Sequence, residues 1–217
     1  MFTFSNIFPQ VKAIGDRLII RHDISYIFLS FLPEKSTEEF IKGIFSENEF
    51  TLGDNKSKVK FKVEGIEILS FPVFKDISAY THELNNSLTS PSAGYQFRTL
   101  SPVCVSKKRE NGSIEYVSPE SPDYAKLLKN NLKEKHIAFY SKPFAGDETF
   151  NFELLSPPKS RLITIKANTK KMTNVKGFHY DFKLQADNIL MQLMYEVGLG
   201  EKNATGFGMV ETVTPLK

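Results

Sequence analysis

The sequence has 217 residues but a single cysteine, no tryptophan and no long apolar run. Cys104 alone cannot form an intrachain disulfide or a cysteine-rich zinc site, so we expect no metal, no cofactor and a reducing, cytoplasmic compartment. The longest apolar stretch, from Tyr26 to Leu32, is far shorter than the roughly 20 residues that cross a membrane. No basic-then-apolar leader precedes it, so we expect neither secretion nor a membrane partner.

The remaining composition is that of a folded chain with a weak positive charge. Hydrophobic residues make up 41% of the chain and charged residues 24%, which is enough to build a core. Lysine and arginine total 28 against 25 acidic residues, and this net charge of +3 does not by itself indicate a nucleic acid. At about 150 residues per domain, the length predicts one large or two small domains.

The first half of the sequence reads as strands, a helix, a further strand and a linker. Ser36 and Glu39 have the spacing of a capping box, which predicts a helix that ends near Asn48. The apolar alternation changes phase at Gly65, which predicts a β-bulge. Strands are predicted at 17–20, 25–31 and 59–68, and the linker at 75–94.

The second half alternates strands and helices. Ser121 is the expected N-cap of one helix, with a proline after it, and Asp187 the expected N-cap of another. Gly198 stands where a left-handed glycine commonly ends a helix. Strands are predicted at 97–106, 114–117, 150–155, 162–167, 178–184 and 207–213.

The order of these elements after residue 95 is the βαββαβ order of a ferredoxin-like domain. The first half has the same kind of elements but lacks an opening strand and helix. We therefore predict an α+β fold with two tandem ferredoxin-like domains. An N-terminal domain with its linker, incomplete at its N-terminus, spans 1–94, and a C-terminal domain spans 95–217.

The most specific stretch runs from Gly198 to Gly208 and contains four glycines. Glycines let the backbone approach a ligand and turn its amides toward phosphate oxygens, and Lys202 adds a charge. The stretch lacks the Gly-Lys-Ser/Thr of a Walker loop. The alternative is a helix cap followed by a tight turn. The residues expected to bind RNA here are Gly198, Gly200, Lys202, Asn203, Gly206 and Gly208.

Positive residues are concentrated in the second half of the chain. From Lys159 to Lys183, seven lysines and arginines accompany one acidic residue, Asp181. A one-sided basic surface is typical of proteins that bind a phosphate backbone, although solvated lysines on exposed strands give the same pattern. Further residues predicted to contact RNA are Arg98, Lys107, Lys108, Arg109, Lys170, Lys171 and Lys176.

A helix that ends in Gly198-Leu-Gly-Glu-Lys-Asn203 and continues to Gly206-Phe-Gly-Met-Val210 resembles the glycine-rich loop of the CRISPR repeat-RNA-processing endoribonucleases, members of the RAMP superfamily. Other segments agree in the same order: Phe2-Thr-Phe-Ser-Asn6, Phe97-Arg-Thr-Leu-Ser-Pro102, Asp123-Tyr-Ala-Lys-Leu-Leu128 and Lys176-Gly-Phe178. The resemblance implies binding of CRISPR repeat RNA in antiviral defence. It also implies metal-independent cleavage, in which a 2′-hydroxyl attacks the adjacent phosphorus and leaves a cyclic phosphate.

The sequence departs from this family at its start, because the opening strand and the histidine-bearing helix are missing. The catalytic residues are therefore unknown, and His22 and His179 are weak candidates. Either Met1 lies inside a longer gene product, or the chain is a shortened subunit. Three functions stay open: an endoribonuclease, a non-catalytic RNA-binding subunit that assembles with other CRISPR-associated subunits or as a homodimer, and a protein-interaction module without an RNA role.

Overall fold

The computed structural model describes residues 1–7, 11–14, 17–20, 24–31, 34–47, 49–53, 58–67, 94–166 and 169–213. The predicted linker at 75–94 lies outside these residues except for Gly94, as do His22, His82 and Ile68. No helix within the described ranges has the length and apolar character to span a membrane.

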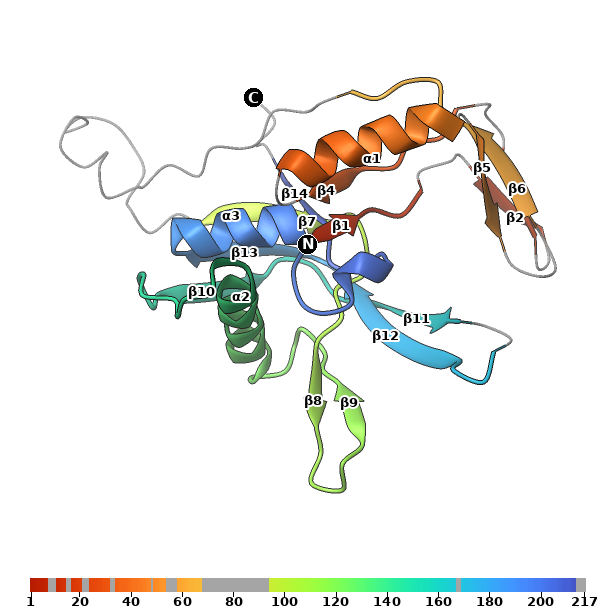
Figure 1. The fold of residues 1–217 in the computed structure, drawn as a ribbon. Coiled ribbons are helices and arrows are strands. Elements are labelled where there is room, and N and C mark those ends of the chain that lie inside the picture. The colour runs from red at the N-terminus through yellow and green to blue at the C-terminus, as the bar shows by residue number, and fades with distance from the viewer. Residues whose placement is uncertain are drawn as a thin grey trace.

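A four-stranded antiparallel sheet forms the centre of the C-terminal half (Figure 1). Its order is β10-β13-β7-β14, so the first and third strands of the fold lie in the middle. Helix α2 (Tyr124–Tyr140) lies between β7 and β10 in the chain, and α3 (Asn188–Val197) lies between β13 and β14. This connectivity is the predicted ferredoxin-like one. The strands are β7 (Tyr95–Thr99), β10 (Phe150–Leu154), β13 (Asp181–Ala186) and β14 (Val210–Thr212).

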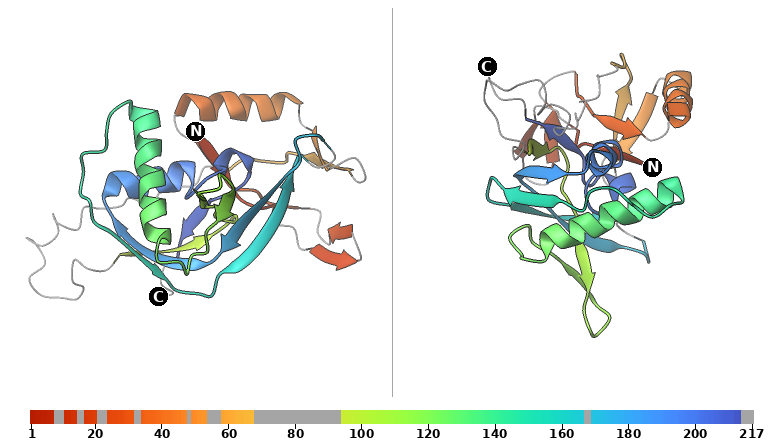
Figure 2. Two further views of the ribbon diagram at one scale, coloured as in Figure 1. Left: turned by 90° about the horizontal axis from the view of Figure 1, so that it is seen from below. Right: turned by 90° about the vertical axis from the view of Figure 1, so that its left-hand side faces the viewer.

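Both helices pack on one face of this sheet (Figure 2). Phe97 and Phe182 are cross-strand partners, both fully buried, and their ring centroids lie 5.3 Å apart. Leu128 of α2 and Leu190 of α3 are buried in the same core. Alternate residues of the predicted strand at 178–184 form one buried face, which contains Phe178, Tyr180, Phe182 and Leu184.

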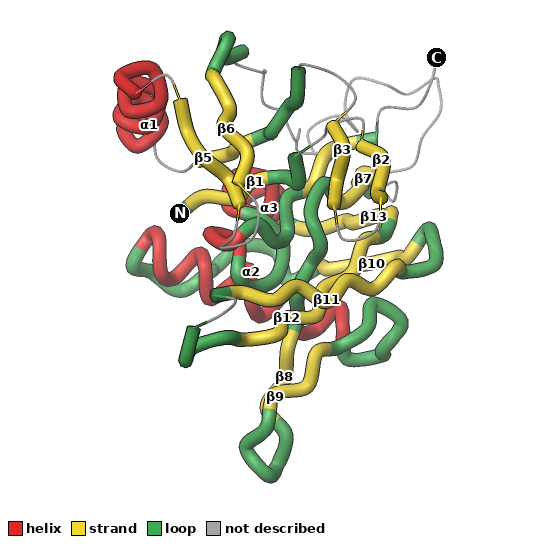
Figure 3. The backbone as a smooth tube through the Cα atoms, turned by 90° about the vertical axis from the view of Figure 1, so that its right-hand side faces the viewer, coloured by secondary structure: helices red, strands yellow, loops and turns green. Residues whose placement is uncertain are grey.

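Two hairpins interrupt the ferredoxin-like order and extend from the sheet (Figure 3). One joins β8 (Ser106–Lys108) to β9 (Ile114–Tyr116), and the other joins β11 (Lys159–Ile165) to β12 (Thr173–His179). The predicted strand at 178–184 is wrong in one respect, because the chain changes partner at Tyr180. Residues before it pair with β11 and residues after it pair with β7 and β10.

Where the structure describes the N-terminal half, it consists of short antiparallel strand pairs and one helix. Its elements are β1 (Phe2–Phe4) paired with β4 (Leu29–Phe31), β2 (Val11–Ile14) with β3 (Arg17–Ile20), α1 (Glu34–Glu47), and β5 (Glu49–Gly53) with β6 (Lys58–Lys62). The division into domains at 94/95 stays a prediction.

Local signals misplaced several boundaries. Helix α1 begins at Glu34, so Ser36 lies inside its first turn and is not the N-cap. Strand β6 ends at Lys62 and no strand follows over 63–67, so the predicted bulge at Gly65 is wrong. Ser121 belongs to a turn that precedes α2, because its carbonyl accepts from the Tyr124 amide. Asp187 does cap α3, accepting from the Ile189 amide at 2.8 Å.

The first strand and the residues just after it form hydrogen bonds with the C-terminal half of the chain. Thr3 is fully buried, and its hydroxyl donates to the Phe207 carbonyl at 3.1 Å. The Asn6 amide donates to the Leu100 carbonyl at 3.2 Å. These contacts place the start of the chain beside the loop that follows α3.

The core predicts a large effect of removing one ring. Phe182→Ala should lower the free energy of unfolding by about 3–5 kcal/mol, because it leaves a cavity between Phe97 and Phe152. Urea denaturation measures the change. Leu162→Ala, at a side chain that is 68% exposed, is the control and should stay within about 0.5 kcal/mol. Equal effects of the two substitutions would contradict this assignment of the core.

Candidate nucleic-acid interface

The segment from Gly198 to Gly208, which we call the glycine loop, is packed tightly against its surroundings. All four of its glycines have positive φ, between 70° and 89°. A Cβ atom at any of them would lie closer than 3.0 Å to another group: Asn203 at Gly198, the Cys104 carbonyl at Gly200, the Phe4 ring at Gly206 and the Leu199 carbonyl at Gly208. Close packing and positive φ therefore both require glycine.

The prediction that the glycine amides turn outward to phosphate is wrong for most of the loop. The Gly198 amide donates to the Met194 carbonyl, that of Gly206 to the Asn203 carbonyl, and that of Gly208 to the Pro102 carbonyl. Gly200 is buried. The side-chain amide of Asn203 donates to the Leu199 and Phe207 carbonyls. Gly198, Asn203, Gly206 and Gly208 therefore build the loop, because these donors are used inside the protein.

The end of α3 also differs from expectation. Gly198 has φ 89° and ψ 157°, which lies outside the left-handed helical region. The chain therefore leaves the helix in an extended conformation, which carries it toward the 101–104 segment. There the Glu201 amide donates to the Cys104 carbonyl at 2.7 Å.

The outer turn of the glycine loop is exposed. Lys202 has a left-handed φ of 62° and precedes the short 3-10 helix η2 (Asn203–Thr205). Lys202, Ala204 and Thr205 are exposed to solvent. No carboxylate in the described part of the chain forms an ion pair with Lys202. Of the predicted binding residues in the loop, Lys202 is the one whose side chain is available to a ligand.

The hairpin over 159–179, which we call the basic hairpin, contains six positive residues and no acidic residue. None of them has an ion pair among the residues that the structure describes. The hairpin is anchored beside the glycine loop, because Val175 is buried with Phe207 and Cys104 in a small second core. A Cβ atom at Gly177 would lie 2.8 Å from the Pro102 side chain and 3.1 Å from the Phe207 ring, so this close approach favours glycine. The positive residues are Lys159, Arg161, Lys166, Lys170, Lys171 and Lys176.

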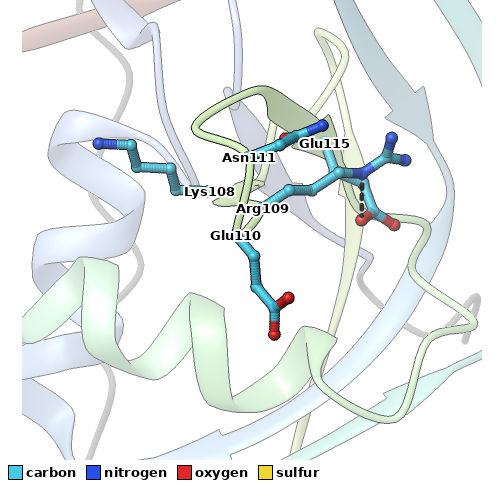
Figure 4. A pocket seen from close by; sticks show the side chains of 5 residues that line it. All are labelled: Lys108, Arg109, Glu110, Asn111 and Glu115. Carbon is cyan, nitrogen blue, oxygen red and sulfur yellow. Dashed lines mark hydrogen bonds and ion pairs between the residues drawn. The ribbon is translucent and has the colours of Figure 1, made fainter.

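The positive charges predicted around β8 and β9 are largely offset by acidic neighbours. Arg109 forms an ion pair with Glu115 (Figure 4), in which Nε lies 3.0 Å from the carboxylate, and Lys107 Nζ lies 3.4 Å from Asp123. On the sheet, Arg98 Nε lies 3.2 Å from Asp181. Lys108 extends away from the Arg109–Glu115 pair at a hollow whose lining carries both signs of charge (Figure 4). The sequence predicted one basic surface that joins these residues to the basic hairpin. Instead, Arg98, Lys107 and Arg109 each have an acidic partner, and Lys108 lies beside residues of both charges.

The two described histidines are engaged inside the protein. His179 Nδ1 lies 3.1 Å from the Thr99 hydroxyl, whose oxygen accepts from the Tyr180 amide, so the hydroxyl hydrogen is available to Nδ1. Burial lowers the pKa of His179, and nearby Arg161 lowers it further. His136 is buried, and its Nδ1 lies 3.2 Å from the Lys142 carbonyl.

Lys135 is a site residue that the sequence reasoning missed. From α2, its Nζ donates to the Gly198 and Gly200 carbonyls of the glycine loop, each at 2.6 Å. Burial lowers the pKa of this amine from 10.5 to about 7, against an opposing effect of Glu201. A signal was present, because Lys135 lies seven positions after Leu128 and therefore on the buried stripe of α2.

No three or more His, Cys, Asp or Glu side chains gather as a metal site within the described ranges. Residues 86–212, more than half of the chain, match the family described as CRISPR associated protein Cas6, C-terminal. The chain belongs to the Cas6 family. The resemblance seen in the sequence is therefore confirmed at the level of the family.

Relatives within the family extend the match over the rest of the chain. The chain is 29% identical over 218 residues to the CRISPR-associated endoribonuclease Cas6 1 of Methanocaldococcus jannaschii, covering 98% of the chain and 73% of that protein. It is 33% identical over 134 residues to the CRISPR-associated endoribonuclease Cas6 of Pyrococcus furiosus, covering 61% of the chain and 47% of that protein.

A solved structure confirms the predicted fold class. The structure named CRISPR associated protein Cas6 is 26% identical and aligns with a TM-score of 0.72, over 98% of this chain and 78% of the other. The chain thus has the α+β fold of the Cas6 and RAMP proteins, with tandem ferredoxin-like domains. The predicted incompleteness of the first domain stays a prediction.

The packing of the glycine loop predicts opposite effects at two glycines. Gly208→Ala should lower the free energy of unfolding by more than about 1 kcal/mol, because φ is +81° and the new methyl would meet the Leu199 carbonyl. Gly43→Ala, within α1 and with no atom within 4 Å of the new methyl, should raise it by about 0.5–1 kcal/mol. Urea denaturation of both variants is the measurement, and a neutral Gly208→Ala would contradict the required glycine.

Proposed function

We propose that this Cas6-family protein binds CRISPR repeat RNA across the basic hairpin and the outer turn of the glycine loop. The observation that carries the proposal is the packing of Val175 against Phe207, which anchors a hairpin with six positive residues and no acidic residue next to the loop that carries Lys202. A positive surface without acids attracts the phosphate backbone and releases its counterions. The relatives named endoribonucleases support RNA as the ligand.

The central sheet favours backbone contacts over base stacking. In RNA-binding sheets of the RRM type, aromatic residues on the open face stack on bases. Here the aromatic residues of the central strands point toward the helices, as Phe97, Phe152 and Phe182 do. The alternate positions, which face away from the helices, are Gln96, Arg98, Asn151, Glu153, Asp181, Lys183, Gln185 and Glu211. This face has mixed charge and no ring, so we assign the RNA to the basic hairpin and the loop.

We further propose that the protein processes precursor CRISPR RNA in the cytoplasm by metal-independent cleavage. Attack of a 2′-hydroxyl on the adjacent phosphorus needs a base, an acid for the leaving oxygen and a cation near the phosphorane. Lys202 and the basic hairpin are suited to supply the cation. The acid and base are assigned to no residue, and His22 and His82 lie outside the described residues.

The second candidate is RNA binding without cleavage. It is favoured by the internal contacts of both described histidines, since His179 binds Thr99 and His136 binds the Lys142 carbonyl. The second ring nitrogen of His179, Nε2, lies 3.4 Å from the side-chain amide of Asn6, and His136 is buried, so neither ring presents an open nitrogen to RNA. Assembly with a second copy or with other CRISPR-associated subunits stays a prediction of the sequence.

A cleavage assay separates the two candidates. End-labelled repeat RNA incubated with the purified protein in EDTA should give one cut per repeat, with a cyclic phosphate that resists phosphatase. A 2′-deoxy substitution at the mapped cleavage position should abolish the product, because the nucleophile is missing. Binding without a product would support the non-catalytic candidate. Absence of salt-dependent binding would contradict both.

Single lysines test the interface itself. Lys202→Ala and Lys176→Ala should each weaken RNA binding and reduce the slope of log affinity against log salt by about one. Fluorescence anisotropy at several salt concentrations is the measurement. Lys126→Ala, an exposed lysine on α2 away from the loop, is the matched control and should leave the slope unchanged. If Lys202→Ala and Lys126→Ala have the same slope as the unaltered protein, the glycine loop does not contact phosphate.

A further inference from the structure

Lys135 joins a helix of the core to the inner side of the glycine loop. Its Nζ donates to the carbonyls of Gly198 and Gly200, each at 2.6 Å. Gly198 follows directly after α3, and carbonyls at the end of a helix lack intrahelical donors and carry partial negative charge. An amine from a second helix therefore caps α3 and the first residues of the loop together.

Leu199, which lies between these two glycines, links the start of the glycine loop to its end. The Leu199 amide donates to the Gly208 carbonyl at 2.7 Å, and the Leu199 carbonyl accepts from Asn203. Residues 198–200 of the loop are therefore held on one side by Lys135, and on the other side by Gly208 and Asn203. The outer turn with Lys202 begins two residues after Gly200.

The charge around the amine is set by one carboxylate. Glu201 is the charged group that affects Lys135, and its carboxylate is itself held by the Ser106 amide at 2.8 Å and the Ser106 hydroxyl. Burial lowers the pKa of the Lys135 amine to about 7, so the amine is partly protonated at neutral pH. Phosphate groups bound near Lys202 favour the protonated form of a nearby amine.

We propose that Lys135 is a positioning residue for RNA, which holds the glycine loop in its binding shape and takes up a proton when RNA binds. Lys135 does not touch the RNA in this scheme, since its amine lies on the inner side of the loop. The proton-uptake part rests on the function proposed above, whereas the anchoring of the loop does not.

The variant Lys135→Met keeps the length of the side chain and removes the amine. The substitution leaves the Gly198 and Gly200 carbonyls without this donor, so the melting temperature should fall by a few degrees while the protein stays folded. Hydrogen exchange without RNA should be at least about 10-fold faster at the Leu199 and Gly208 amides, because the loop opens more often. Affinity for repeat RNA should fall by about 10-fold at pH 6.5. Lys126→Met, on the exposed side of the same helix, should change neither quantity.

Calorimetry tests the proton directly in the unaltered protein. RNA binding at pH 8 in two buffers with different ionisation enthalpies should report the uptake of a fraction of a proton, and Lys135→Met should lose that uptake. The lowered pKa of His179 keeps its imidazole neutral at this pH, so it does not produce the signal. Binding without proton uptake by the unaltered protein would overturn the proton-uptake part of the proposal.

The outcomes separate this inference from the proposed function. Unchanged exchange at Leu199 and Gly208 in Lys135→Met would overturn the anchoring role, whatever the RNA affinity. Faster exchange together with normal RNA affinity would overturn the positioning role. Faster exchange in a protein that binds no repeat RNA would support the anchoring and refute the proposed function alone.

Discussion

The structure of the candidate interface depends on the close approach of the glycine loop to the segment that follows β7. The Gly208 amide binds the Pro102 carbonyl at 2.9 Å, and the Glu201 amide binds the Cys104 carbonyl at 2.7 Å. A Cβ atom at Gly208 would collide with the Leu199 carbonyl, and one at Gly200 would collide with the Cys104 carbonyl, so side chains at these two glycines would prevent both contacts. The approach brings Phe207 under the basic hairpin, so the position of the positive residues follows from backbone packing between two segments about a hundred residues apart in sequence.

The charge distribution separates the two hairpins, although both are rich in lysine and arginine. On β8–β9, Arg109 and Lys107 have acidic partners within 3.4 Å. Exposed pairs of this kind contribute only about 0–1 kcal/mol to stability, but each one also cancels a charge in the surface field. The basic hairpin has no acid in its sequence, so its field is not reduced in this way. A phosphate backbone is therefore attracted to one hairpin more than to the other.

The sequence predicted the parts of the fold that depend on periodicity, and it failed where partners are distant in the chain. The helix after Ser121 and the cap at Asp187 depend on local signals and were predicted correctly. The alternation through Tyr180 continues while the strand changes partner, so β12 and β13 were merged. The direction of the loop amides depends on carbonyls at Pro102 and Cys104, which no local pattern indicates. Lys135 was overlooked because a lysine on a buried stripe is read as solvated unless its acceptors are known.

The first strand of the chain has a consequence for the mechanics of the loop. The buried Thr3 hydroxyl donates to the Phe207 carbonyl at 3.1 Å, and the Phe4 ring covers Gly206. The loop is therefore clamped between Lys135 on one side and β1 on the other. Moving β1 away would break the Thr3–Phe207 hydrogen bond and uncover Gly206, next to the Phe207 side chain that packs against Val175 of the basic hairpin. The contacts of the first strand with the glycine loop therefore also support the residue on which the basic hairpin packs.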